Sequence, residues 1–253
     1  MSLYLLVSLK SESEAGLSAS LKYFLLSALS TTFLFLGVTI LYYKTGSTNY
    51  EIINTMTLYM KNDIYIEKAI SLILFTILFK LSAAPFYQWA PDLYENIETK
   101  VTMWMIIIPK LAVLCFLYSF SNFFILFLEL PSVQLILIIS ATLSLFIGSV
   151  ALNNQWYIKR FFAYSGISHV GYMLLALACL APQGYLFYIF VYAITTINIF
   201  TIIIILGQYL GRDLKMIQDL AGIFRHNPYL SLALAINLFS LAGVCLTLFS
   251  TKS

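Results

Sequence analysis

Charged residues are scarce in this chain. Lys, Arg, Asp and Glu make up 10% of the 253 residues, whereas a soluble domain has about a quarter. The net charge of +3 is spread over several loops rather than gathered in one block, which argues against a nucleic-acid partner. Because 61% of the residues are hydrophobic and 16% are aromatic, the composition predicts an integral membrane protein with aromatic side chains at lipid and interface positions.

Motifs for metals, haem and nucleotides are also missing. The three cysteines, Cys115, Cys179 and Cys245, each lie alone in an apolar run. This placement predicts small core side chains rather than disulfides or metal ligands. The sequence has no Gly-rich phosphate loop, zinc motif or haem-attachment motif, so we expect no metal and no cofactor to be bound by this chain.

Seven apolar stretches predict an all-α, polytopic bundle that forms a single transmembrane domain over residues 1–253. About 20 apolar residues cross a bilayer as a helix. The expected spans are residues 21–43, 69–89, 101–120, 132–152, 161–180, 185–210 and 228–249. Residues 1–9 are too short to cross and follow no basic region, so we interpret them as the last turns of a preceding helix.

Basic residues are distributed unevenly between alternate loops, which predicts the orientation of the bundle. One set of loops holds Lys10, Lys22, Lys100, Lys159, Arg160, Arg212, Lys215 and Arg225. The other set holds only Lys44, Lys61 and Lys68. The positive-inside rule places the first set on the cytoplasmic or matrix side.

The chain is organised around residues 80–94, KLSAAPFYQWAPDLY, which follow an apolar run. Lys80 and then Pro85 stand where a membrane helix would be expected to continue. Pro85 has no N–H to donate to the carbonyl one turn back, so the helix must kink or break. Such a break persists in hydrocarbon only where protein or a wet cavity satisfies the freed backbone groups. We therefore predict a broken helix at residues 80–85 and a transport function beside it.

Lys110 is predicted to be buried in the membrane. It lies roughly 15 Å from either end of its span, too far for its amine to reach water comfortably. A lone ammonium there costs roughly 2.5–3.5 kcal/mol on insertion scales, so Lys110 must meet a carboxylate, water or another helix. A functional role is favoured over a lysine paired only for packing. For Lys80, position alone fits a helix end at the interface equally well, and the break at Pro85 favours a cavity.

The fifth span has one polar face, because its polar residues fall at helical positions i, i+3, i+4 and i+7. They are Ser165, Ser168, His169 and Tyr172. A histidine among hydroxyls can relay protons, but a histidine hydrogen-bonded between packed helices fits the same pattern, and the residues alone leave both open.

Two further groups of polar residues have simpler interpretations. The sixth span carries a stripe formed by Tyr185, Tyr188, Tyr192 and Thr195, with Thr196 and Asn198 beside it. Stripes of this kind more often bond neighbouring helices than line a path, and the same holds for Asn237. The carboxylates of Asp92, Glu95 and Glu98 are expected to form a solvated face near the membrane surface.

Four ordered motifs resemble a known family. KLSAAPFYQWAPDLYE, PKLAVL, KRFFAYSGISHVGYMLLAL and NLFSLAGVCLTLF are similar, in that order, to the subunit 2 family of NADH dehydrogenase, called subunit N in the bacterial respiratory complex I. SEAGLSASLKYFLLSA is similar to the segment before that family's sixth helix. The resemblance covers nearly the whole chain and implies an antiporter-like, all-helical subunit with two inverted repeats, each containing a broken helix.

The resemblance also implies roles for four residues. Lys80 corresponds to the lysine of the first broken helix, and Lys110 to the central lysine on the next helix. Both would belong to a chain of protonatable groups across the membrane plane. His169 matches the histidine of the family's ISH(V/L)GY segment. Lys252 matches the lysine of the second broken helix, although the spacing after SLAG is one residue short.

The sequence departs from the family pattern in three ways. Tyr87 stands where many members have a histidine, so this position cannot exchange protons as an imidazole would. Val244 and Cys245 follow SLAG in place of the usual proline, which softens the second break. The chain begins within the family's fifth helix, so the preceding helices, the glutamate expected to pair with Lys80 and the final helices are absent. We expect either that other polypeptides supply them or that this chain is a fragment.

The motifs together imply a proton-translocating membrane-arm subunit of NADH:ubiquinone oxidoreductase. Lys80 and Lys110 would bind and release protons, each charge disfavouring the other by repulsion. NADH, FMN, iron–sulfur clusters and quinone would bind elsewhere in the complex. Two alternatives stay open: a cation/proton antiporter subunit, and a structural spacer that does not pump.

The expected location is the mitochondrial inner membrane, as a multi-pass protein. Phe, Tyr, Ile and Asn are plentiful, as AT-rich organellar genomes tend to encode, and this favours it over a bacterial plasma membrane. The expected partners are other membrane-arm subunits of complex I, chains that supply the missing helices, and membrane lipids.

Overall fold

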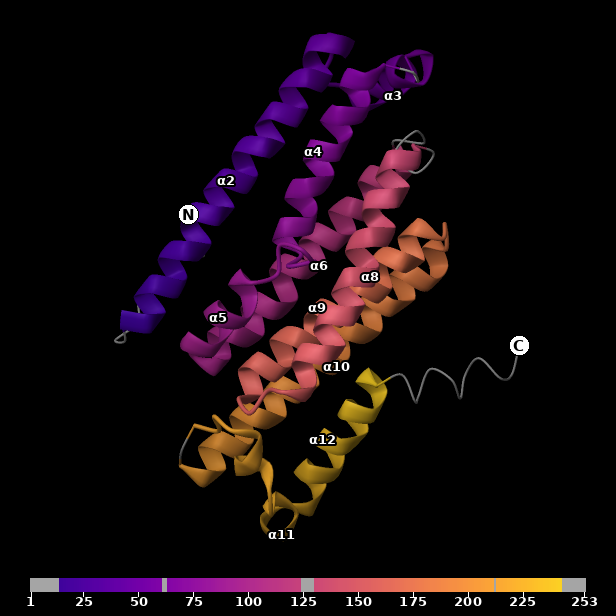
Figure 1. The fold of residues 1–253 in the computed structure, drawn as a ribbon. Helices are drawn as coiled ribbons and strands as arrows, with labels where there is room; N and C mark the ends of the chain where they lie inside the picture. Colours follow the sequence, from indigo (N-terminus) through magenta and orange to yellow (C-terminus); the bar gives the residue numbers. More distant parts are fainter. Residues whose placement is uncertain (1–13, 61–62, 124–129, 212, 243–253) are drawn as a thin grey trace, which may run out of the picture.

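The chain folds into a bundle of α-helices (Figure 1). The computed structural model describes residues 14–60, 63–123, 130–211 and 213–242. These residues contain no β-strand, only one isolated antiparallel bridge between Tyr157 and Met216. The helices are α2 (Glu14–Thr45), α3 (Tyr50–Tyr59), α4 (Ile64–Lys80), α5 (Trp89–Asn96), α6 (Thr99–Phe123), α8 (Pro131–Asn153), α9 (Ile158–Ala178), α10 (Pro182–Leu210), the 3₁₀ turn η1 (Ile217–Leu220), α11 (Ile223–His226) and α12 (Pro228–Leu241). The predicted all-helical fold is confirmed.

Five of the described helices are long and apolar enough to cross a membrane, which makes the chain a multi-pass membrane protein. They are Gly16–Thr45 of α2, Thr99–Ser121 of α6, Pro131–Asn153, Ile158–Ala178 and Pro182–Leu210. Of the seventh expected span, residues 228–241 form α12, and residues 243–249 lie outside the described residues. The predictions for residues 1–9, Cys245 and Lys252 also lie outside the described residues.

Successive long helices run in alternate directions (Figure 1). Residues 46–49 and 179–181 lie at one end of the bundle, called here the α3 end. Residues 97–98, 154–157 and 213–227 lie at the opposite end, called the α11 end. The described lysines of the larger basic set that lie outside α2, namely Lys100, Lys159 and Lys215, therefore share the α11 end.

The predicted helix break is present between α4 and α5. Helix α4 ends at Lys80, the Ala84–Pro85 peptide is cis, and α5 begins at Trp89. Two serines of α8 bind the peptide groups of Ala84: its N–H donates to Ser144 Oγ at 2.8 Å, and Ser140 Oγ donates to its carbonyl at 2.7 Å. Protein side chains thus satisfy the backbone groups that the break frees, as a membrane interior requires.

Trp89 closes the break from the α5 side. Its Nε1–H donates to the carbonyl of Phe79 at 3.2 Å, and its ring stacks on that of Phe79 with centroids 5.8 Å apart. The Trp89 ring also packs at 4.8 Å against Tyr23 of α2. The first turn of α5 is therefore fixed to both α4 and α2.

Two segments that lie between expected spans are helical. Helix α3 lies between the expected spans 21–43 and 69–89, and α4 begins at Ile64, earlier than the expected residue 69. Helix α5 lies mostly between the expected spans 69–89 and 101–120. Asn49 and Asp63 act as N-caps, each accepting a hydrogen bond from the backbone N–H two residues on. Helices α3 and α4 therefore each have a local N-terminal signal in the sequence, although neither start was predicted from the apolar stretches.

Asp63 also joins α4 to the end of α2. Lys44 Nζ donates to Asp63 Oδ2 at 2.7 Å, and the backbone N–H of Tyr65 donates to the same carboxylate at 2.9 Å. These two hydrogen bonds, the one from Lys44 first, hold the pKa of Asp63 below its ordinary value.

The outer faces of the long helices are apolar. Leu25 and Phe35 of α2, Phe146 of α8 and Phe190 of α10 are all exposed. In a membrane protein such faces meet lipid or neighbouring apolar helices rather than water. Cys115 and Cys179 lie on the exposed surface, so the prediction that they are core side chains was wrong: an apolar run indicates membrane depth but not which face a residue occupies.

Candidate functional site

Lys80 and Lys110 line the same cavity, called here the lysine cavity. Its volume is about 550 Å³, and it lies between α2, α4, α5 and α6. Helix α2 contributes Ser27 and Thr31 to the wall, and α5 contributes Tyr94. The structure therefore brings together two lysines that are thirty residues apart in the sequence, next to the broken helix.

Lys110 is buried, with a relative exposure of 2%. It follows Pro109, which leaves α6 without one backbone hydrogen bond. Its neighbours one turn away, Ile106, Ile107 and Leu114, are apolar and buried. Among the described residues, Lys110 Nζ has no hydrogen-bond partner. A buried lysine of this kind is a basic group that proteins use for proton exchange.

Lys80 occupies a different environment. It is the last residue of α4 and its side chain is exposed, although it also lines the lysine cavity. The sequence left two positions open for Lys80, a helix end or a cavity wall. In the structure Lys80 occupies both at once. Tyr23 and Trp89, which are in ring contact, line the same cavity.

A glycine faces Lys110 from α9. A Cβ atom added to Gly166 would lie 3.0 Å from Lys110 Nζ and 3.1 Å from the hydroxyl oxygen of Tyr192. Tyr192, on α10, is 3% exposed, and its hydroxyl also has no hydrogen-bond partner among the described residues. Two buried polar atoms without partners therefore share the space along Gly166.

His169 lies on the same helix, less than one turn beyond Gly166. Its Nδ1 is 2.8 Å from the hydroxyl oxygen of Tyr188, and its ring centroid is 5.4 Å from that of Tyr192. A cavity of about 10 Å³ touches His169, Tyr188, Tyr192 and Ser240. The histidine is thus held between packed helices and also borders a polar space, so both interpretations weighed from the sequence fit its surroundings.

Of the other residues of the α10 stripe, Tyr185 and Asn198 bond a neighbouring helix, as the sequence predicted, whereas Thr195 and Thr196 bond within α10. Tyr185 donates from its hydroxyl to the carbonyl of Leu114 at 2.9 Å. Thr195 and Thr196 donate to carbonyls of their own helix. Asn198 donates to the side chain of Asn237 at 3.5 Å. Tyr192 differs from all of these because its hydroxyl has no partner among the described residues and borders the space at Gly166 that Lys110 also borders.

The acidic residues are more structured than expected. Arg160 of α9 lies 3.1 Å from the carboxylate of Asp92 and 2.7 Å from that of Glu95, and both carboxylates are partly buried. The expectation of a simply solvated face was therefore wrong for these two. Tyr87, which replaces the family histidine, packs against Tyr164 with ring centroids 6.4 Å apart and does not line the lysine cavity.

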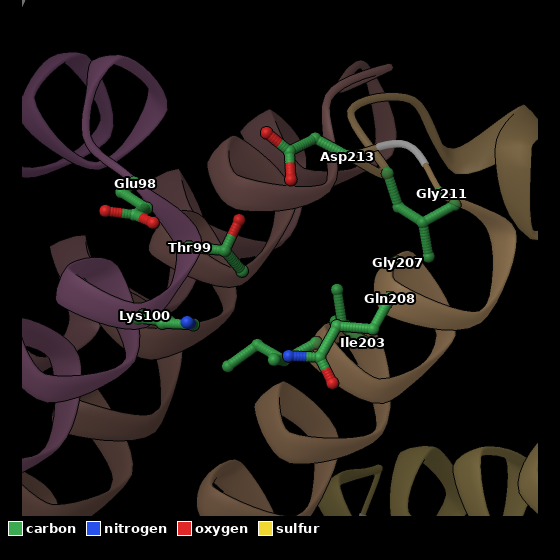
Figure 2. A pocket seen from close by; sticks show the side chains of 10 residues that line it. Glu98, Thr99, Lys100, Ile203, Gly207, Gln208, Gly211 and Asp213 are labelled. Carbon is green, nitrogen blue, oxygen red and sulfur yellow. The ribbon is translucent and has the colours of Figure 1, made fainter.

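A second sizeable cavity, of about 400 Å³, lies at the α11 end between the start of α6 and the end of α10 (Figure 2). Figure 2 shows Glu98, Thr99 and Lys100 on one side, and Gln208 and Asp213 on the other. The charged side chains of this cavity are exposed. It contains none of the buried basic groups predicted as site residues, so the lysine cavity is the stronger candidate.

Sequence reasoning missed two features of this region. Ser140 and Ser144, which hold the break, lie in an apolar helix and have no signal of their own, because their role depends on where Ala84 lies. Tyr192 was assigned to packing along with its neighbours. Its position four residues after Tyr188 and four before Thr196 could not distinguish it.

Among the described residues, no group of three or more His, Cys, Asp or Glu could hold a metal ion.

Comparison with known proteins identifies relatives along almost the whole chain. The family described as NADH:quinone oxidoreductase/Mrp antiporter, TM, matches residues 1–252. NADH-ubiquinone oxidoreductase chain 2 of Rhizopus oryzae is 42% identical over 251 residues, which cover 95% of this chain and 48% of that protein. NADH-quinone oxidoreductase subunit N of Hydrogenovibrio crunogenus is 32% identical over 252 residues, which cover 96% of this chain and 52% of that protein.

The fold is also found in a solved structure. A chain of respiratory complex I from Thermus thermophilus with bound Aureothin superposes with a TM-score of 0.76 and 31% sequence identity, covering 95% of this chain and 51% of that one. This chain therefore spans about half the length of the relatives it matches.

Proposed function

We propose, from the premise that this chain belongs to the NADH:quinone oxidoreductase/Mrp antiporter transmembrane family, that it carries a proton-translocating site of a complex I membrane arm. The observation that carries the proposal is the lysine cavity, which both Lys80 and Lys110 line beside a broken helix. The relatives named above as oxidoreductase chains favour this assignment over other members of the family.

The proposed mechanism uses the two lysines as proton carriers. Lys110 is buried and has no fixed partner among the described residues, so its charge depends on the hydration of the cavity and on nearby charges. A proton on Lys80 disfavours a proton on Lys110 by repulsion across the same cavity. The break at residues 81–88 is the element that can adopt two arrangements and so couple this exchange to a remote reaction.

The partners and location follow from the same proposal. We assign the chain to the mitochondrial inner membrane or a bacterial plasma membrane, among other membrane-arm subunits and lipids. NADH oxidation and quinone reduction take place in other subunits, and His169 and Lys252 continue the proton path from Lys110. Polypeptides that supply the remaining half of the relatives' length complete the subunit.

The test is Lys110→Ala in the assembled complex. Proton uptake driven by NADH oxidation should fall about tenfold or more, because a group that transfers protons contributes roughly 10²–10⁴-fold. Proton translocation per NADH is measured in sealed membrane vesicles, and assembly is checked on a native gel. Lys68→Ala removes an exposed lysine of α4 and serves as the matched control.

Three outcomes discriminate the alternatives. A normal ratio of protons to electrons in the assembled Lys110→Ala enzyme contradicts the proposal and favours a structural spacer. Sodium-dependent transport without NADH favours a cation/proton antiporter. Loss of pumping in both variants alike points to a general effect of removing lysines rather than to a specific role of Lys110.

A further inference from the structure

Two buried polar atoms near Gly166 have no hydrogen-bond partner among the described residues, whereas a similar tyrosine hydroxyl on the same helix α10 has one. Among the described residues, Lys110 Nζ on α6 and the Tyr192 hydroxyl on α10 have no hydrogen-bond partner. Leaving such groups unpaired in an apolar interior is costly. By contrast, the hydroxyl of Tyr185, two turns earlier on α10, has a backbone partner in α6. The unpaired state of Tyr192 therefore requires an explanation.

The absence of a side chain at residue 166 leaves open a space that both atoms border. Any Cβ there would lie 3.0 Å from Lys110 Nζ and 3.1 Å from the Tyr192 hydroxyl oxygen. Both contacts are tighter than ordinary van der Waals distances, so alanine would push the amine and the hydroxyl away. With glycine, the flexible lysine can approach the hydroxyl directly or through one water molecule.

Tyr192 also borders His169, which lies on α9 as Gly166 does. The two ring centroids are 5.4 Å apart, and both residues line the cavity of about 10 Å³ that also touches Ser240 of α12. A space of that order holds about one water molecule. Because the Nδ1 atom of His169 already contacts the Tyr188 hydroxyl at 2.8 Å, its Nε2 atom is the one left for a proton arriving from elsewhere. Tyr192 thus has both a buried amine and a buried imidazole in its surroundings.

We propose that the Tyr192 hydroxyl passes protons between Lys110 and His169, an inference that rests on the proposed function. The Lys110 ammonium gives a proton to the Tyr192 oxygen, directly or through one water molecule. Tyr192 releases its own hydroxyl proton toward His169. Lysine is left neutral, imidazole becomes imidazolium, and tyrosine is neutral before and after. No electron moves, and the only bonds exchanged are N–H and O–H bonds. Gly166 keeps the path open.

The test compares Tyr192→Phe with Tyr185→Phe in the assembled complex. Each variant removes one buried hydroxyl from α10, but only that of Tyr192 borders the space at Gly166 that Lys110 also borders. Proton uptake per NADH is measured in sealed vesicles across pH. We expect Tyr192→Phe to lower pumping about tenfold and to change its pH profile. Tyr185→Phe should keep both, although loss of the bond to Leu114 lowers its thermal midpoint. Equal pumping and equal pH profiles in the two variants would overturn the inference.

A second variant approaches the same contact from α9, in case Tyr192→Phe does not assemble. Gly166→Ala should lower pumping because its methyl group displaces the Lys110 amine, whereas Gly184→Ala, which meets no atom within 4 Å, should not. If Lys110→Ala abolishes pumping while Tyr192→Phe and Gly166→Ala leave it intact, only this inference fails. If Lys110→Ala itself pumps normally, the proposed function fails.

Discussion

The surroundings of single residues determine which buried polar groups of this bundle lack a hydrogen-bond partner. Lys110 and Tyr192 differ from the other buried polar residues in their surroundings rather than in their chemistry. Most buried hydroxyls of the bundle donate to a carbonyl of their own or a neighbouring helix. The Lys110 amine and the Tyr192 hydroxyl instead face Gly166. Their availability is thus a consequence of one missing side chain on a third helix.

Gly148 provides a test of close packing at the residue scale. A Cβ atom at this position would clash with Ser168 Oγ and would lie 2.9 Å from the Ser168 backbone nitrogen. We expect Gly148→Ala to destabilise the protein by about 1–3 kcal/mol, because α8 and α9 must separate to accommodate it. The measurement is the thermal midpoint of the purified protein in detergent, with Gly184→Ala as the control. A Gly148→Ala midpoint at or above that of Gly184→Ala would show that the two helices can part at little cost.

At the scale of elements, the broken helix depends on a neighbouring helix. Pro85 removes a donor, but the position of the resulting loop is set by Ser140 and Ser144 of α8, which bind both peptide groups of Ala84. Ser144 in turn donates to the carbonyl of Ser140 at 2.6 Å. The break is therefore held on the α8 side by a short polar ladder and on the α5 side by Trp89.

Removal of one rung of this ladder should loosen the break. Ser144→Ala leaves the buried N–H of Ala84 without an acceptor, which costs about 1–3 kcal/mol. Ser149→Ala on the same helix is the control, because Ser149 is exposed and bonds only its own helix. Proteolysis of the segment around residues 81–88, together with the thermal midpoint, reports the change. Ser144→Ala and Ser149→Ala proteins that behave identically would mean that another group satisfies Ala84.

The elements that the sequence predicted well are those with a local cause. Pro85 has no N–H in any environment, so the break could be placed within a few residues. Helix α5 was not predicted, because most of it lies between two expected spans, and Pro91 and the acidic residues of WAPDLYEN are typical of a connection between helices. In the structure Pro91 lies in the first turn of α5, where no backbone N–H is needed. Pro91 was therefore a possible signal for the start of a helix, but so close to the break at Pro85 it was not recognised as one.

The candidate site could be predicted residue by residue but not as an arrangement. The burial of Lys110 followed from its distance to both ends of its span. The shared cavity with Lys80 depends on the packing of α2 and α5, and the space shared with Tyr192 depends on Gly166 of α9. Helix periodicity shows which residues share a face, but it does not show which neighbouring helix that face meets.

At the scale of the whole molecule, the two ends of the bundle differ in the number of basic residues that they carry. The α11 end carries Lys100, Lys159, Arg160 and Lys215, whereas Lys44 and Lys68 are the described basic residues at the α3 end. Arg160 is neutralised by Asp92 and Glu95, and Lys159 donates to the carbonyl of Ile97. Lys159 and Arg160, two of the residues on which the predicted orientation rests, therefore also tie α9 to the region around α5.

This asymmetry predicts the orientation of the chain in its membrane. We expect the α11 end to face the cytoplasm or matrix, because basic loops are retained on that side. Thr48→Cys at the α3 end and Asn154→Cys at the α11 end place exposed thiols on opposite sides. A membrane-impermeant maleimide added to mitoplasts or right-side-out vesicles should label Thr48→Cys and spare Asn154→Cys, above the background of the native cysteines. Inverted vesicles should give the reverse. Labelling of Asn154→Cys from the outside would mean that the bundle has the opposite orientation, because charged loops do not cross the bilayer once the helices are inserted.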